Sequence, residues 1–130
     1  MVVVDTDILI DFLNSKQGAP ELITNLINSG EILFITQINE YELLKGAFGS
    51  KHSDRHVPQL RELLSHFKYI LLDPKSIELG AQIHASLLKE GNTLGDFDIL
   101  IASMCIIKNQ KLLTRNVKDF SRIKELDLYK

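Results

Sequence analysis

The sequence has no tryptophan, one cysteine, three prolines and seven glycines among its 130 residues. The single cysteine, Cys105, excludes an internal disulfide, which is typical of a protein from a reducing compartment. So few prolines and glycines leave no low-complexity linker. No apolar run approaches the length needed to cross a membrane, and no signal-peptide pattern stands at the amino terminus. We therefore expect a cytoplasmic protein that is not inserted in a membrane.

The residues that are present suit one folded domain. A hydrophobic content of 45% and a charged content of 25% are ordinary for a globular protein. A chain of 130 residues is long enough for one hydrophobic core and too short for two. We expect residues 1–130 to form a single domain.

Charge is unevenly distributed, although the formal net charge is only -2. Residues 1–48 hold two Lys or Arg against seven Asp or Glu, whereas residues 108–130 hold seven against three. A basic segment beside an acidic centre suits a metal-dependent enzyme that acts on a polyanion. On charge alone, an ordinary solvated surface is the simpler interpretation.

Short apolar runs alternate with segments of helical periodicity along the whole chain. This alternation predicts an α/β fold, namely a three-layer α/β/α domain with a mostly parallel sheet of four or five strands. The expected strands are residues 1–4, 32–35, 69–72, 111–114 and, less regularly, 126–129. Among the helices, the one after the second strand is expected to present one apolar face made of Ile38, Tyr41, Leu44 and Phe48. Two others are expected at 58–67 and, buried between layers, at 97–107.

Acidic residues follow three of the predicted strands, at the points where helices begin. Because parallel strands all end at one edge of the sheet, we expect these residues to lie close together. Carboxylates without histidine or cysteine partners suit Mg²⁺ or Mn²⁺, which can polarise a phosphodiester and activate water. The residues are Asp5 after the first strand, Glu40 and Glu42 after the second, and Asp96, Asp98, Asn116 and Asp119 around the fourth.

Taken singly, each acid has a simpler explanation, because the helix dipole favours acids in the first turn of any helix. This explanation holds especially for Asp7 and Glu40, and Asp7 is expected to have no other role. The combination of acids at three helix starts is what predicts a metal site.

Four segments resemble the blocks of the PIN-domain ribonucleases and, within them, the VapC-like toxins of toxin-antitoxin pairs. In chain order they are VVVDTDILID, ITQINEYELLKGAF, DILIA and KLLTRNVKDF, and they span essentially the full chain. The resemblance matches Asp5, Glu42 and Asp98 to the family's acids, with the E-L-x-x-G pattern selecting Glu42 over Glu40. It implies Mg²⁺- or Mn²⁺-dependent endoribonuclease activity, an RNA substrate and a protein antitoxin as partner.

The fourth acidic position differs, because members of the family often place an aspartate where this chain has Asn116. The resemblance implies that Thr114 and Asn116 support the site or position water, and we count Asn116 with the catalytic residues Asp5, Glu42 and Asp98. A further metal ligand is expected from Asp96 rather than Asp119, since Asp96 lies two residues before Asp98 at the same helix start.

Substrate contacts are expected after the last core strand, from Thr114, Arg115, Lys118 and Arg122. A homodimer is also expected, because the family suggests one and because the apolar residues around 60–67 exceed what one small core needs. An antitoxin segment is expected across the acidic cleft.

Two alternatives remain open at this point. A haloacid-dehalogenase-like phosphatase resembles VVVDTD, LFIT and Gly95-Asp96, but it requires a hydrophobic strand immediately before Gly95, where the chain reads KEGNTL. It also leaves Glu42 and TRNVKDF unexplained. The second alternative is a PIN-like module that binds a partner without cleaving RNA, and a missing core acid would have favoured it. None of the three is missing.

Overall fold

The run of three valines at the start of the chain forms β1 (Val2–Val4), a fully buried inner strand of the sheet in this computed structural model, which describes all of residues 1–130. The sheet order is β3-β2-β1-β4, and every pair is parallel. The other strands are β2 (Leu33–Thr36), β3 (Lys68–Ile70) and β4 (Lys111–Leu113). The predicted parallel sheet is confirmed with four strands. At 126–129 there is only one parallel bridge, between Leu112 and Leu128, in place of a fifth strand.

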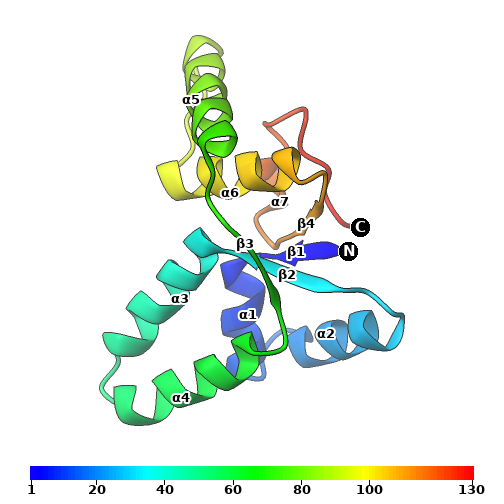
Figure 1. Cartoon of the computed structure of the whole chain (residues 1–130), viewed down its shortest axis with the longest axis vertical. Coiled ribbons are helices and arrows are strands. Elements are labelled where there is room, and N and C mark those ends of the chain that lie inside the picture. Colours follow the sequence, from blue (N-terminus) through cyan, green and yellow to red (C-terminus); the bar gives the residue numbers. More distant parts are fainter.

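Helices cover both faces of the sheet, which gives the three layers predicted (Figure 1). On one face lie α1 (Thr6–Leu13), α2 (Ala19–Asn28), α3 (Gln37–Phe48) and α4 (Ser53–Leu64). On the other lie α5 (Pro74–Lys89), α6 (Asp96–Ile107) and α7 (Val117–Phe120). Successive strand residues point to opposite faces, so Val2 and Val4 join the first core and Val3 joins the second.

Helix α6 is the buried helix that the apolar segment predicts. Its residues from Ile101 to Cys105 are all fully buried. It packs against α5 at Gly80, where an added Cβ would come within 3.3 Å of the Leu100 side chain. No helix combines the length and the apolar character that crossing a membrane would need.

The buried face of α3 differs from the apolar face expected for it. Asn39 and Leu43 are buried, whereas Tyr41 is 53% exposed and Phe48 is 60% exposed. Ile38 and Leu44 are partly buried and pack against the cores as expected, so the expectation was wrong only for Tyr41 and Phe48. Asn39 takes the buried position because its amide finds hydrogen-bond partners inside the protein.

Helix α4 begins at Ser53, earlier than expected, and contains Pro58 within it rather than at its start. Residues Leu60, Leu63, Leu64 and Phe67 are all buried in the core of the single chain. The expectation that these residues supply surplus apolar surface for a homodimer is therefore wrong.

Candidate active site

Asp5 lies where β1 ends and α1 begins, beside the end of β4. The helices that follow β1 and β4 cover opposite faces of the sheet, and such a point leaves a crevice at the carboxyl ends of the strands (Figure 1). The Asp5 carboxylate is only 6% exposed and three groups fix it. The Thr6 backbone N–H (2.9 Å) and the Asn39 amide (3.3 Å) donate to Oδ1, and the Thr114 hydroxyl donates to Oδ2 (2.7 Å).

Burial raises the pKa of Asp5 from 3.8 to about 6. The hydrogen bonds from Thr114 and Thr6 act in the opposite direction, and the charges of Asp7 and Asp98 add to the rise. Hydrogen bonds hold this carboxylate in place, but no cation pairs with it.

Glu42 is tied to Asp5 through two polar side chains. The Thr6 hydroxyl donates to Glu42 Oε1 over 2.7 Å and accepts from the Asn39 amide over 3.0 Å. Asn39 is held in turn by reciprocal capping bonds with Thr36 at the start of α3. The other candidate, Glu40, interacts instead with the phenol of Tyr69 on β3. The geometry therefore favours Glu42, as the sequence pattern does.

Asp98 lies at the start of α6 and joins the same group of acids. Its pKa is raised by burial first and then by the charges of Glu42, Asp119 and Asp7. Carboxylates from α1, α3, α6 and α7 therefore share one electrostatic site. The charge of Glu42 thus acts on Asp98, and the charge of Asp98 acts on Asp5.

Asp7 also belongs to this acid cluster, although the sequence gives it only a helix-start role. Its Oδ2 accepts from the Arg115 backbone N–H over 3.2 Å, whereas its Oδ1 is buried without any hydrogen-bond partner. Burial raises the pKa of Asp7. No pattern in the sequence signals the contact with Arg115, because Arg115 lies 108 residues away along the chain.

Asp96 lies away from the acid cluster. It lines a separate cavity between α5 and α6, together with Gly80 and His84. Residues two positions apart on an α-helix point about 200° apart, so Asp96 and Asp98 cannot face the same site. Asp119, by contrast, acts on Asp98, while its carboxylate lies 3.6 Å from the Arg122 guanidinium. This geometry favours Asp119 over Asp96 as the additional acid, the reverse of the sequence-based expectation.

The residues expected to bind substrate fall into two groups. Thr114 is 8% exposed and donates its hydroxyl to Asp5, so it orients that carboxylate rather than facing a ligand. The Asn116 backbone N–H donates to the Thr114 hydroxyl over 3.0 Å.

The three basic residues of this segment differ in how they are held. Arg115 is bound to Asp11 (3.0 Å) and to the Gln17 carbonyl (2.7 Å). Arg122 donates to the Thr93 carbonyl over 3.1 Å and lies near Asp119. Lys118 is exposed and has no acidic partner.

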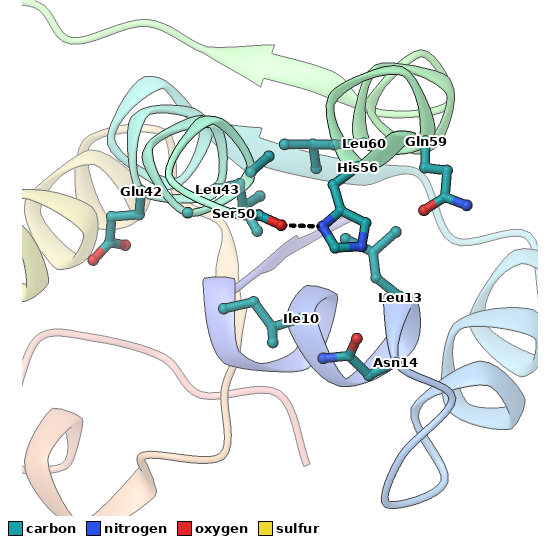
Figure 2. A pocket seen from close by; sticks show the side chains of 11 residues that line it. Ile10, Leu13, Asn14, Glu42, Leu43, Ser50, His56, Gln59 and Leu60 are labelled. Carbon is teal, nitrogen blue, oxygen red and sulfur yellow. Dashed lines mark hydrogen bonds between the residues drawn. The ribbon is translucent and has the colours of Figure 1, made fainter. Parts of the chain in front are cut away.

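A cavity of about 340 Å³ opens beside Glu42, between α1, α3 and α4 (Figure 2). Its apolar walls include Ile10 and Leu13, and the Ser50 hydroxyl lies 2.6 Å from His56 Nδ1 at one side. Figure 2 shows Glu42 at the rim, with its carboxylate directed away from His56. The cavity is thus an apolar neighbour of the acid cluster, and of the residues expected in the site only Glu42 touches it.

The PIN domain family model matches residues 2–126. This chain belongs to the PIN domain family. It is similar to Ribonuclease VapC1 of Methanocaldococcus jannaschii, with 34% identity over 127 residues, 98% of this chain and 84% of that protein. It is 32% identical over 126 residues to Ribonuclease VapC1 of Haemophilus influenzae strain R2866, covering 94% and 91%.

Solved structures have the same fold as this PIN domain. A crystal structure of VapBC2 from Rickettsia felis, bound to a DNA fragment from its promoter, matches with a TM-score of 0.90 and 27% identity, covering 99% of this chain and 98% of that one. The family resemblance is confirmed. The haloacid-dehalogenase-like alternative is not supported, because no strand lies between α5 and α6, where that fold requires one before Gly95.

The acid cluster offers only oxygen ligands, which is the donor chemistry of Mg²⁺ and Mn²⁺. The Oδ1 atom of Asp7, also in this cluster, is buried without a hydrogen-bond partner. No three His, Cys, Asp or Glu side chains form a group that could hold a metal ion by itself. Mg²⁺ is usually bound through one or two carboxylates together with water and substrate phosphates, so these residues fit an ion that the substrate helps to hold.

Proposed function

We propose that this PIN domain is an endoribonuclease that hydrolyses RNA phosphodiester bonds with the help of Mg²⁺ or Mn²⁺. The observation that carries this function is the electrostatic and hydrogen-bonded linkage of Asp5, at the end of β1, with Glu42 of α3 and Asp98 of α6. The similarity to proteins named Ribonuclease VapC supports the same activity.

Asp5, Glu42 and Asp98 are the residues that would hold the ion, with Asp119 as the additional acid. When bound, such an ion polarises the phosphodiester and lowers the pKa of water. The chain's own contribution is orientation. Thr114 presents Asp5 to the crevice by holding its Oδ2 atom.

Two further groups complete the orientation of the site. Thr6 fixes the carboxylate of Glu42, so that Asp5 and Glu42 keep a constant relation to one another. Asn116 is held by its backbone bond to Thr114, which leaves its neutral amide as a donor for the scissile phosphate or for the attacking water. Without a charge, this amide adds no repulsion to the acid cluster.

We further propose that the chain is the toxin of a toxin-antitoxin pair and acts in the cytoplasm. The cavity beside Glu42, whose walls include Ile10, Leu13 and Leu43, would take hydrophobic side chains of an antitoxin segment that crosses the acid cluster. Ile10 lines this cavity and is 44% exposed, so Ile10→Glu should weaken binding to the protein encoded by the adjacent reading frame while RNA cleavage persists. Unchanged antitoxin binding by Ile10→Glu would show that the antitoxin docks elsewhere on the protein.

Cleavage of a single-stranded RNA by the purified protein tests the function. Cleavage within the chain should occur with Mg²⁺, stop in EDTA, and be lost in Asp5→Asn and Asp98→Asn. Glu78→Gln, an exposed carboxylate on α5, is the matched control and should cleave like the wild type. Hydrolysis of small phosphate esters without RNA cleavage would identify a phosphatase, and a folded protein that cleaves neither would be a binding module.

A further inference from the structure

A pair of aromatic rings joins α3 to α6 directly beside the acid cluster. The ring centroids of Tyr41 and Phe97 are 5.6 Å apart and the ring planes are nearly perpendicular, at 84°. Neither ring belongs to either hydrophobic core, and Tyr41 is 53% and Phe97 37% exposed. Core packing therefore does not account for two large rings held in contact at the surface.

The position of the rings relative to the acids follows from the chain. Tyr41 immediately precedes Glu42 in α3, and Phe97 immediately precedes Asp98 in α6. The Cα atoms of such neighbours lie about 3.8 Å apart. The Tyr41 and Phe97 rings contact each other between α3 and α6. The charge of Glu42 acts on Asp98 between the same two helices. A polynucleotide with a phosphate at the acids therefore has a base within reach of the rings.

Lys45 adds a positive charge to this pair. Its Nζ lies 5.7 Å from the Tyr41 ring centroid and 6.0 Å from that of Phe97. Unlike Arg115 and Arg122, Lys45 forms no salt bridge with an acid of the chain. Exposed rings that stack on bases, next to a cation that contacts the backbone, are how proteins bind single-stranded nucleic acid.

We propose that Tyr41, Phe97 and Lys45 form a stacking platform for one unpaired nucleobase of the RNA, next to the phosphate that is cleaved. This assignment rests on the proposed ribonuclease function and names its substrate class as single-stranded RNA. A base inside a duplex is already stacked on its neighbours and does not offer its face to a protein ring. Because every base has such a face, the platform selects unpaired RNA rather than one base.

Binding of a short fluorescent single-stranded RNA in EDTA, where cleavage does not interfere, tests the platform. Tyr41→Leu and Phe97→Leu should each weaken binding by about 5- to 150-fold. The double variant should bind about as weakly as the weaker single variant, because both rings serve one base. Lys45→Gln should reduce the slope of log affinity against log salt by about 0.7.

Phe48→Leu is the matched control, because Phe48 is 60% exposed on the same helix but lies about 10 Å farther along its axis than Tyr41. It should bind RNA like the wild type. All leucine variants should unfold at the wild-type temperature, since the rings lie outside both cores. With Mg²⁺, the ring variants should raise KM for single-stranded RNA with little change in kcat. The fluorescence of 2-aminopurine placed beside the cleaved phosphate should be quenched on binding to the wild type and not to the ring variants.

The outcomes separate the platform from the ribonuclease function. Ring variants that bind RNA like Phe48→Leu overturn the platform, even if the wild type cleaves RNA. A wild-type dimer that Tyr41→Leu and Phe97→Leu dissociate also overturns it, because the rings then form an interface between two copies. Wild-type RNA binding that depends on the rings, without cleavage under any metal condition, keeps the platform and refutes the ribonuclease function.

Discussion

Replacing Asp5 with asparagine should make the metal-free protein more stable at neutral pH. The pKa of Asp5 is raised from 3.8 to about 6 in the folded protein, with burial as the largest cause. The folded state therefore holds this proton more tightly than the unfolded chain does. The resulting stability is fully present below pH 3.8 and is lost as pH rises through about 6. An asparagine side chain cannot ionise, so the Asp5→Asn variant does not lose stability as the pH rises.

The size of the effect follows from the same pKa. A rise from 3.8 to about 6 corresponds to about 3 kcal/mol of differential stability between the two protonation states. The hydrogen bonds to Thr6, Asn39 and Thr114 also change in the variant, but they do so at every pH. The stability difference between variant and wild type should therefore grow by up to about 3 kcal/mol between pH 4 and pH 7.5.

Urea denaturation in EDTA across this pH range measures the effect. Glu78→Gln, which neutralises an exposed carboxylate, should show no comparable pH dependence. Adding Mg²⁺ should make the wild type more stable than Asp5→Asn. Mg²⁺ at 100 times its dissociation constant stabilises the wild type by about 2.7 kcal/mol, whereas Asp5→Asn binds the ion poorly. A stability difference that stays constant from pH 4 to pH 7.5 would refute the assigned burial of an unpaired charge at Asp5.

Three other substitutions give separate tests of the site. Asp119→Asn should impair Mg²⁺-dependent cleavage more than Asp96→Asn, because only Asp119 acts on the acid cluster. Mg²⁺ titrations that show the reverse order would make Asp96 the additional metal ligand. Thr114→Val should raise the pKa of Asp5 further and slow cleavage by about 10- to 100-fold, since a hydrogen bond to a charged group is lost; an unchanged rate would make the Thr114 hydroxyl dispensable. Lys118→Gln should flatten the salt dependence of RNA affinity by about 0.7 in log-log slope, and an unaltered slope would place Lys118 away from RNA.

The parts of the site that depend on local pattern could be predicted from the sequence. A buried strand followed by an acid and a helix predicted Asp5, and an acid at the start of an apolar helix, together with the family resemblance, predicted Asp98. Because parallel strands end at one edge of the sheet, the prediction that the acids lie near one another needed no distance information. The expectation for Asp96 left out the separation of about 200° between helix positions two apart, which the sequence already implied and which favours Asp119.

Other features depended on tertiary contacts that no local pattern contains. Asn39 is fully buried because Asp5 and Thr6 accept its amide hydrogens, and these partners are more than thirty residues away in the chain. Because α3 turns the face with Asn39 toward the protein interior, Tyr41 on another face of the helix is exposed. Asp7 accepts a hydrogen bond from the Arg115 backbone at the far end of the sequence, which no local pattern around Asp7 contains.

Binding of Mn²⁺ in the presence of a non-cleavable RNA analogue tests the central claim that the carboxylates of Asp5, Glu42 and Asp98 act together on a divalent ion. Loss of the electron paramagnetic resonance signal of free Mn²⁺ reports the bound ion directly. The wild type and Glu78→Gln should bind the ion equally, and Asp5→Asn, Glu42→Gln and Asp98→Asn should each weaken binding at least about tenfold, the equivalent of about 1.4 kcal/mol. Wild-type Mn²⁺ affinity in all three acid variants would contradict the account.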